Sequence, residues 1–546
     1  MTTEEPASRT RTDVESALLG QATYRSLGEQ RLSPQEERFE KGRRTVGLFL
    51  APVVTLLFLA LPLDLPYAQQ GLAAILLGVV VLWVCEPVPI PIGGLIGMAL
   101  IVFLGVVPAD DAIAPFGSST VFTFIGAFIL AQAMLKHGLA RRFAFFILSL
   151  PGVGRSTVRV IIAFGLVTCL LSAFVSNTAT VAMLLPTALG LLTVIAKLMQ
   201  DKGVVAPDFD PRRVRVGAAL LLMLAYGASV GGLLTPVGSP PNLIGRGLIE
   251  EATGVTITFL DWFLIALPIC ALMFVVLAAV LLLLNKPELR RIEGVEEYIR
   301  QARGDMGRMS RKEINTIIAF SVTVALWLFP GFVNLLTGGD AEAAAAGSQV
   351  LSVLTAIADR LDEGMVAVFG AALLFLLPAD WRKREFTLNW SDAARIDWGT
   401  VVLFGTGIVF GTLLDETGLA VTIGTASAGA LGLGGIVGIT IFGVVLAIVV
   451  SETTSNTASA AVVVPIIIPI ATAANVDPLI PALAATFAAS FGFMLPVSTP
   501  QNAVVYGSGA VPITNMIRSG ASFDVLGAIL IIVLLPVMAS LLGLAA

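Results

Sequence analysis

Long apolar runs, separated by short polar segments, fill the chain from about residue 46 to its end. A membrane-spanning helix needs about 20 consecutive, mostly apolar residues, and many of these runs reach or approach that length. In the first half they lie at about 46–66, 70–86, 90–108, 117–138, 157–197, 215–252 and 259–285. After a charged connector they lie at about 313–336, 363–378, 398–415, 434–474, 479–511 and 522–544. The pattern predicts an all-α polytopic membrane protein.

The composition agrees with a bilayer environment and excludes several classes of protein. Of the 546 residues, 56% are hydrophobic and 13% are charged, whereas soluble domains carry about 25% charged residues. A net charge of −5 argues against a nucleic-acid partner. No Gly-rich phosphate loop, HExxH or CxxC sequence offers a soluble catalytic site. Residues 1–45 are polar, and they are too long and too charged for a signal peptide, so we interpret them as a cytoplasmic tail.

The most informative feature is an internal repeat, whose three matches occur in the same order in both halves. The matches are Thr120-Val121 and Phe124 with Thr400-Val401 and Phe404, Ser176-Asn177-Thr178-Ala179 with Ser455-Asn456-Thr457-Ala458, and Gly238-Ser239-Pro240-Pro241-Asn242 with Ser498-Thr499-Pro500-Gln501-Asn502. The first match is displaced by 280 positions and the second by 279. Small-residue tetrapeptides are common in membrane helices, but their abundance does not explain an ordered set of three. Residues 176–178 and 455–457 are called the SNT segments below.

Basic residues accumulate on the cytoplasmic side of membrane proteins and therefore indicate orientation. We assume that each long apolar stretch with an SNT segment forms a re-entrant hairpin, which returns to the side of the membrane from which it entered. Every other apolar run is taken to cross the membrane once. The predicted cytoplasmic segments then hold 31 of the 33 Lys and Arg residues, with Arg246 and Arg360 as the exceptions. This arrangement has about 11 crossings, a cytoplasmic N-terminus and a C-terminus outside. An odd number of crossings separates Thr120 from Thr400, so the sequence predicts two inverted repeats.

Inverted repeats with broken helices are typical of secondary transporters, whose substrate site lies near the midplane where the repeats meet. The sequence therefore predicts five parts. They are a tail (1–45), N-terminal spans that form a scaffold (46–108), a first inverted repeat (109–285), a cytoplasmic connector (286–312) and a second inverted repeat (313–546). Each repeat contains one SNT hairpin and one broken span.

The breaks in the helices predict where ions bind. Pro240, Pro241 and Pro500 lack the amide hydrogen that a continuing helix needs, so each interrupted span should form two half-helices around an irregular link. The SNT segments carry residue types favoured at helix N-caps, so each returning arm should present free N–H groups to an anion. The unpaired carbonyl groups of the arriving arm, facing the link at Gly238 or Ser498, suit a small hard cation.

The charge inventory favours cation-coupled transport. Neither SNT segment has a Lys, Arg or His in the apolar residues around it, at 160–196 and 434–474. Even one charge at the bilayer centre costs about 2.5–3.5 kcal/mol on insertion scales, so a dianion brought there needs co-bound cations. Na⁺ symport is therefore favoured over exchange, in which one anion replaces another. We interpret Glu452 as a local cap or hydrogen-bonding residue, and His137, the only histidine, as an interfacial residue.

The paired SNT segments, each followed by a GSPPN- or TPxN-type link, resemble those of the divalent anion/sodium symporter family, which transports dicarboxylates, citrate or sulfate. The resemblance covers the chain from about residue 46 and implies a homodimer, whose transport domain moves like an elevator against a scaffold domain. It implies one sodium site at Ser172, Ser176, Asn177 and Gly238, and a second at Ser451, Thr454, Asn456 and Ser498. It implies substrate contacts at Ser176, Asn177, Thr178, Ser455, Asn456, Thr457, Thr499 and Pro500. Gln501 departs from the Pro-Pro form of the first link, which leaves the shape of the second link open.

We therefore expect a transporter and not an enzyme, with no cofactor and with Na⁺ as the coupling ion. Its expected partners are a small anionic substrate, sodium ions, the lipid bilayer of the plasma membrane and a second copy of the chain. A C4-dicarboxylate such as succinate is the expected substrate. A sodium-independent dicarboxylate exchanger and a sulfate symporter of the same family are alternatives. A pump or antiporter of a related superfamily, for arsenite or protons, fits less well, because the span-buried ionisable residues of such a protein are missing. A channel or an intramembrane enzyme is the alternative from a different class.

Overall fold

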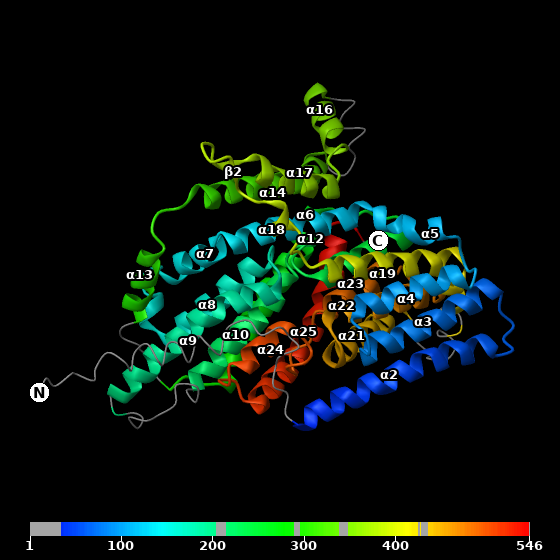
Figure 1. Ribbon diagram of the computed structural model, residues 1–546, viewed down its shortest axis with the longest axis horizontal. Helices are drawn as coiled ribbons and strands as arrows, with labels where there is room; N and C mark the ends of the chain where they lie inside the picture. The colour runs from blue at the N-terminus through cyan, green and yellow to red at the C-terminus, as the bar shows by residue number, and fades with distance from the viewer. Residues whose placement is uncertain are drawn as a thin grey trace, which may run out of the picture.

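The structure is a computed structural model, and it describes residues 34–201, 203, 215–288, 295–337, 348–423, 426 and 435–544. Most of the predicted tail 1–45, and residues 289–294 of the predicted connector, lie outside the described residues. The described chain is nearly all helical (Figure 1). Its two short strands, β1 (Pro378–Asp380) and β2 (Glu385–Phe386), pair in antiparallel fashion. The predicted all-α fold class is therefore confirmed.

The described chain begins with three apolar helices that pack in sequence order. They are α2 (Pro34–Ala60), α3 (Tyr67–Cys85) and α4 (Ile90–Phe103). Two short helical segments follow, α5 (Ala109–Ile113) and η2 (Ala114–Gly117). α3 packs on both α2 and α4, and α4 also contacts α19 (Trp398–Glu416) of the second repeat. These N-terminal helices therefore connect to the rest of the protein through a helix distant in sequence.

The first repeat contains a helical hairpin and a helix that is broken in its middle. Its elements are α6 (Ser119–Lys136), α7 (Leu139–Leu148), η3 (Val153–Arg155), α8 (Thr157–Ser172), α9 (Asn177–Asp201), α10 (Arg215–Gly232), α11 (Pro240–Thr253) and α12 (Phe259–Leu284). The hairpin is α8–α9, and its turn contains the first SNT segment. The broken helix is α10–α11, and the proline pair that opens α11 explains the break, because proline is well tolerated at the first helical positions but not inside a helix.

The second repeat has the same order of elements. After α13 (Val295–Asp305), α14 (Arg311–Leu336), α16 (Gln349–Ala358), α17 (Glu363–Leu376) and the short α18 (Trp390–Ala393) come α19, α21 (Gly435–Thr453), α22 (Asn456–Ala473), α23 (Leu479–Ala488), α24 (Pro500–Gly507) and α25 (Ile513–Leu541). Here the hairpin is α21–α22, and the broken helix is α23–α24. Pro500 opens α24, as Pro240 opens α11.

The two repeats pack against each other in a reciprocal way. α11 of the first repeat contacts α22 and α23, and α24 of the second repeat contacts α9 and α10 (Figure 1). α12 and α25, the last helices of the two repeats, also pack on each other. A buried hydrogen bond from Gln501 Nε2 to Ser229 Oγ, 2.9 Å long, joins α24 to α10. Each half-helix that follows a link therefore lies against the returning arm of the opposite hairpin.

Nine helices in the described part of the chain are long and apolar enough to cross a membrane. They are α2 from Lys41, α3, α6, α9, α12, α14, α21, α22 and α25. Shorter apolar helices, among them α8, α10, α17 and α19, supply the remaining membrane-embedded structure. The predicted number of crossings, about 11, remains approximate.

Some element boundaries differ from those that the hydrophobic runs predict. The last helix begins at Ile513 and not at about residue 522, since its polar first turns do not stop the helix. The helices α7 and α13 lie outside the predicted spans, because both are short and amphipathic and bury only one face. Val295 and Ile299 form the buried face of α13, within the predicted cytoplasmic connector.

Candidate functional site

The turn of the first hairpin brings together a serine and an asparagine that the sequence assigns to a sodium site. α8 ends at Ser172 and α9 begins at Asn177. Both side chains are buried, and Ser172 Oγ donates a hydrogen bond to Asn177 Oδ1 over 2.5 Å. The asparagine is therefore held at the open start of α9, where the backbone N–H groups have no partner within the helix.

The link of the first broken helix lies directly against this turn. A side-chain carbon added at Gly238 would lie 2.7 Å from the carbonyl oxygen of Gly232, 2.8 Å from that of Ala173 and 3.0 Å from that of Ser172. One added at Gly232 would lie 2.5 Å from Asn177 Oδ1. Three carbonyl oxygens thus surround Gly238, and Asn177 Oδ1 lies against the neighbouring Gly232. These four oxygens are called the first cage below. Converging carbonyl oxygens at helix ends are the usual ligands of transported Na⁺.

The second hairpin repeats this arrangement. Ser451 Oγ lies 2.8 Å from Asn456 Oδ1 and 2.8 Å from the carbonyl oxygen of Ala489. A hydroxyl group has a single hydrogen, so one of these two oxygens remains free to face a cation at any time. Asn456 Nδ2 donates to the carbonyl oxygen of Ser490 over 3.3 Å. Ser451 Oγ, Asn456 Oδ1 and the carbonyl oxygens of Ala489 and Ser490 are called the second cage below.

The second hairpin carries, near the end of α21, a carboxylate that the first hairpin lacks. Glu452 is buried, and its Oε1 accepts a hydrogen bond from the backbone N–H of Met494 over 2.7 Å. Ser498 Oγ lies 2.6 Å from Glu452 Oε2 and 3.0 Å from its carbonyl oxygen. The hydrogen-bonding role predicted for Glu452 agrees with these contacts. Ser498, a predicted sodium ligand, is therefore brought to the second hairpin turn.

Each link is held in shape by an asparagine. Asn242 Nδ2 donates to the carbonyl oxygens of Gly232 (2.7 Å) and Thr235 (2.8 Å). Asn502 Nδ2 donates to those of Gly492 (2.8 Å) and, at the matching position, Leu495 (3.1 Å). The two amides thus satisfy carbonyl groups that the interrupted helices leave unpaired. In the sequence these asparagines stand out only as part of the repeat. Their shared place in both links was the signal that they bind the unpaired carbonyl groups there.

Glycines at equivalent positions allow the links to approach the SNT asparagines. Gly492 corresponds to Gly232 at the same displacement, 260 positions, that relates Asn502 to Asn242. A side-chain carbon at Gly492 would lie 3.1 Å from Asn456 Oδ1 and 3.2 Å from Ser451 Oγ. The close approach at this pair of glycines could not be predicted from the sequence, because glycine is abundant in the chain and has no side chain that indicates a role.

The remaining predicted residues occupy different places around the two turns. Ser176 is exposed, and Thr178, Ser455 and Thr457 are partly exposed, so these side chains face outward from the cages. Ser455 Oγ accepts a hydrogen bond from the N–H of Ala458 as the N-cap of α22.

Two further predicted residues serve the local backbone. Thr499 Oγ1 accepts a hydrogen bond from the N–H of Asn502 as the N-cap of α24, directly before Pro500. The Thr454 hydroxyl, just after the end of α21, donates to the carbonyl oxygen of Val450. The hydroxyl hydrogen of Thr454 is therefore bound to the backbone of the hairpin arm.

The positive charges of the described residues lie away from the cages. Arg246 is the only Lys or Arg among them whose side chain is buried. Its Nη1 lies 2.7 Å from Glu363 Oε2 and its Nε lies 3.0 Å from Glu250 Oε1. Two carboxylates therefore already balance this guanidinium.

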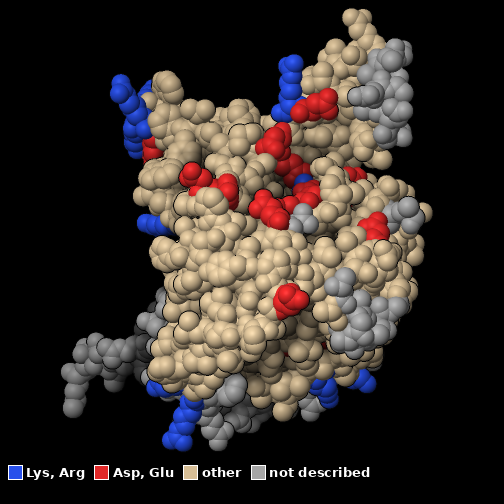
Figure 2. All heavy atoms as spheres, turned by 90° about the vertical axis from the view of Figure 1, so that its right-hand side faces the viewer, with Lys and Arg blue, Asp and Glu red and all other residues tan. Residues whose placement is uncertain are grey.

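Acidic side chains gather across the upper half of the face seen in Figure 2, while Lys and Arg lie mostly toward the top and bottom of the view. A pocket lined by Glu250 and Glu251, together with Ser118, Thr120 and Thr412, opens between α11 and α19. An acidic entrance raises the local concentration of cations.

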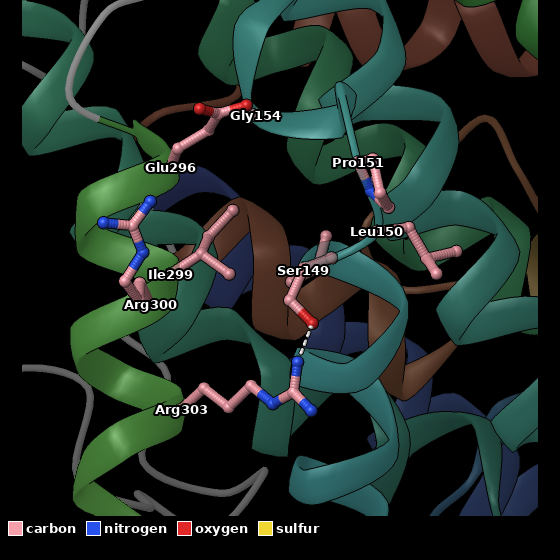
Figure 3. Close-up of a pocket in the computed structure, with 9 residues that line it drawn as sticks. Ser149, Leu150, Pro151, Gly154, Glu296, Ile299, Arg300 and Arg303 are labelled. Atoms are coloured by element: carbon pink, nitrogen blue, oxygen red, sulfur yellow. Dashed lines mark hydrogen bonds between the residues drawn. The ribbon is translucent and has the colours of Figure 1, made fainter.

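A second pocket lies between α13 and the turn after α7 (Figure 3). Across it, Arg303 Nη1 donates a hydrogen bond to Ser149 Oγ over 2.7 Å. Its volume is about 260 Å³, which is below the range of about 300–1,000 Å³ typical of ligand sites. None of the predicted site residues lines it, so it is separate from the SNT segments.

Two oppositely inserted copies of one helical unit, each with a hairpin turn facing a broken helix, define a secondary transporter. Residues 43–544 match the family model described as "Sodium:sulfate symporter transmembrane region". The chain belongs to this family, and the resemblance to divalent anion/sodium symporters is thereby confirmed. Family membership points to transport and not to catalysis.

Curated relatives align with almost the whole chain. The protein named sodium-dependent dicarboxylate transporter SdcS from Staphylococcus saprophyticus is 30% identical over 492 residues, which cover 89% of this chain and 90% of the relative. The protein of the same name from Staphylococcus aureus strain USA300 is 30% identical over 504 residues, or 92% of each chain. Among solved structures, MtrF of Neisseria gonorrhoeae, described as illuminating a class of antimetabolite efflux pumps, has a TM-score of 0.50 at 16% identity. This likeness covers 80% of this chain and 84% of MtrF and concerns the fold alone.

Proposed function

We propose that this protein imports a dicarboxylate together with Na⁺ across the plasma membrane. The observation that carries the proposal is the pair of equivalent oxygen cages, one beside Asn177 and one beside Asn456. Each cage offers carbonyl and amide oxygens to a small cation. Each also lies beside the start of a helix, α9 or α22, whose free N–H groups attract an anion.

The charges of the site explain the coupling. A dianion between the two helix starts meets hydroxyl, amide and N–H donors, while the one buried guanidinium in the described chain is balanced by Glu250 and Glu363. The helix starts supply only about half a positive charge each. Na⁺ ions in the two cages would offset the rest of the dianion's charge. Cation and anion then stabilise each other's binding, which is the thermodynamic basis of coupling.

The chemistry of the SNT segments supports a carboxylate substrate. Their exposed or partly exposed hydroxyl groups, from Ser176, Thr178, Ser455 and Thr457, can donate hydrogen bonds to carboxylate oxygens. A site between the two helix starts would suit an anion with a charged group at each end. Relatives named as dicarboxylate transporters, at 30% identity over about nine tenths of the chain, support the same class. We propose succinate as the representative substrate, and sulfate symport remains the second candidate because of the family's description.

The transport step is proposed to be an elevator motion within a homodimer. The hairpins and the broken helices pack on one another across the repeats and form the proposed moving part. The helices of residues 46–108 form the proposed scaffold. The proposed orientation has a cytoplasmic N-terminus and an external C-terminus, since 31 of the 33 Lys and Arg residues then lie in cytoplasmic segments. The sodium ligands and substrate contacts predicted from the family resemblance are proposed to act in this moving part.

Uptake into proteoliposomes tests the function. Labelled succinate, citrate and sulfate are each offered to proteoliposomes with an inward Na⁺ gradient, with Na⁺ equal on both sides, and with K⁺ in place of Na⁺. We expect concentrative uptake of succinate only with the Na⁺ gradient. Succinate/succinate counterflow that persists in K⁺ alone would instead identify an exchanger. Na⁺-driven uptake of sulfate but not of succinate would replace the substrate assignment.

A further inference from the structure

The two repeats differ in charge at buried positions that their matching helices align. Eight of the eleven buried positions of α12 recur as buried positions of α25, 254 residues later. They are Trp262, Ile265, Ala266, Ile269, Cys270, Met273, Leu277 and Leu281 on α12, and Met516, Ser519, Gly520, Phe523, Asp524, Gly527, Ile531 and Leu535 on α25. This register aligns Asp524 with Cys270. The displacement of the SNT segments, 279, likewise aligns Glu452 with Ala173. The second repeat thus carries two acids where the first repeat carries two residues without charge.

The two acids face each other inside the protein. Asp524 is 4% exposed and Glu452 is 3% exposed. Glu452 is the acidic residue that acts on the Asp524 carboxylate electrostatically, and its carboxyl group lies within hydrogen-bonding reach. Glu452 has partners of its own in the N–H of Met494 and the hydroxyl of Ser498. Neither oxygen of Asp524 has a hydrogen-bond donor among the described residues.

Close packing fixes Asp524 beside the second link. A side-chain carbon at Gly520, one helical turn earlier, would lie 2.4 Å from the carbonyl oxygen of Phe493, so α25 runs directly against the link. Phe523 stacks on Phe491 and meets Phe493 edge-on. Asp524 therefore lies on a closely packed part of α25 and is almost fully removed from solvent.

Among the residues that the structure describes, one further titratable group, a tyrosine, interacts with this acid pair. Tyr226 of α10 is fully buried and interacts electrostatically with both carboxylates. Its hydroxyl hydrogen is donated to the carbonyl oxygen of Phe493 over 2.6 Å, with that of Met516 at 3.2 Å. The lone pairs of the phenolic oxygen therefore remain available. No described Lys or Arg joins the pair, because the one buried guanidinium, that of Arg246, is bound to Glu250 and Glu363.

A bare buried carboxylate is strongly unfavourable, and a second one nearby adds repulsion. Buried charges in proteins are paired with opposite charge or coordinate metal ions. Here the free oxygens are those of Asp524, the remaining lone pairs of the Glu452 carboxylate and the phenolic oxygen of Tyr226. Carboxylate and neutral oxygen ligands together suit a hard monovalent or divalent cation.

We propose that Asp524 and Glu452 bind an additional Na⁺ ion, next to the second cage and without a counterpart in the first repeat. The inference rests on the proposed Na⁺-coupled transport, and it makes the coupling asymmetric. Each cage contributes one ion, and the acid pair contributes one more in the second repeat only. The site would also join α25 to the second hairpin when Na⁺ is bound.

Counting the bound ions tests the site directly. Purified protein is equilibrated with ²²Na⁺ at constant ionic strength, and the bound ions per chain are counted for the wild type, Asp524→Asn and Asp524→Cys. The cysteine variant installs the residue that the first repeat carries at the aligned position. Asp110→Asn, on α5, is the matched control, because Asp110 is an exposed acid. We expect both Asp524 variants to bind one Na⁺ fewer per chain, and the control to bind the wild-type number.

Transport provides the second measurement. The reversal potential of succinate flux in proteoliposomes gives the number of Na⁺ ions per cycle, and we expect this number to fall by one in Asp524→Asn. An unchanged ion count and an unchanged stoichiometry in a folded Asp524→Asn protein would overturn the site. A stoichiometry that loses a proton and no Na⁺ would also overturn it, since the pair would then hold H⁺. Failure of the wild type to couple succinate to Na⁺ would instead refute the proposed function.

Discussion

Filling the first cage with a single methyl group is the sharpest perturbation that the structure offers. In Gly238→Ala the new carbon would lie 2.7–3.0 Å from the carbonyl oxygens of Gly232, Ala173 and Ser172. These oxygens belong to the backbone and cannot rotate away. Gly238 has no left-handed backbone conformation, so the backbone at this position tolerates alanine, and the effect comes from crowding of the cage.

The size of the effect follows from the cost of overpacking. Forcing one extra methyl group into a close-packed site costs about 1–3 kcal/mol. At about 1.4 kcal/mol per tenfold change in affinity, the Na⁺ concentration for half-maximal uptake should rise about 5- to 150-fold. The matched control is Gly438→Ala on α21, where an added carbon would meet no atom within 4 Å.

The assay is the initial rate of labelled succinate uptake into proteoliposomes, measured over a range of Na⁺ concentrations. Gly438→Ala should keep the wild-type Na⁺ dependence. If Gly238→Ala also keeps it, then the carbonyl oxygens around Gly238 do not bind the coupling ion. If both variants lose activity to the same degree, the effect is a general one of helix packing, and the reasoning about the cage is wrong.

Three further predictions concern the parts that support the site. In Asn502→Ala the carbonyl oxygens of the second link lose two hydrogen bonds, each worth about 0.5–1.5 kcal/mol. Calorimetry should therefore show a lower melting temperature together with weaker Na⁺ binding. An unchanged melting temperature would contradict the role of the amide. Arg246→Gln leaves Glu250 and Glu363 without their cation. Because these carboxylates are about a fifth exposed, we expect the free energy of unfolding to fall by about 3 kcal/mol, the low end for a broken buried pair. A fall below about 1 kcal/mol in a denaturant titration would refute this role. Burial lowers the pKa of His137 below its usual 6.5, although its hydrogen bond to Thr387 acts in the opposite direction. The folded protein therefore binds this proton more weakly than the unfolded chain does, and the free energy of unfolding should fall as the pH drops from about 6.5. His137→Gln should remove this decline.

The repeated motifs carry most of what the sequence could predict about the site. Residue spacing located both SNT segments, and the prolines located both links, because proline at the first position of a helix is a local effect. The structure places Ser172, Asn177 and Gly238 together, as the family resemblance implied. Those contacts follow from a hairpin and a link that are each encoded within one short stretch of chain.

Contacts that involve residues outside the repeated motifs could not be predicted from the sequence. The sequence offers no partner for Glu452, because Asp524 lies on another helix and outside every repeated motif. Its alignment with Cys270 becomes visible only when the buried faces of α12 and α25 are compared. Arg246 likewise gave no sign that Glu363, 117 residues away, would balance its charge. In each case the fold, and not the local sequence, brings the partners together.

The proposed coupling requires that both hairpin turns act as one site for the anion and its cations. Equilibrium binding of labelled succinate to purified wild-type protein, Asn177→Ala and Asn456→Ala, each with Na⁺ and with K⁺, tests this claim most directly. We predict saturable binding to the wild type in Na⁺ only, and no binding to either variant, although both remain folded. Binding that survives in either variant, or that is as tight in K⁺ as in Na⁺, would contradict the claim.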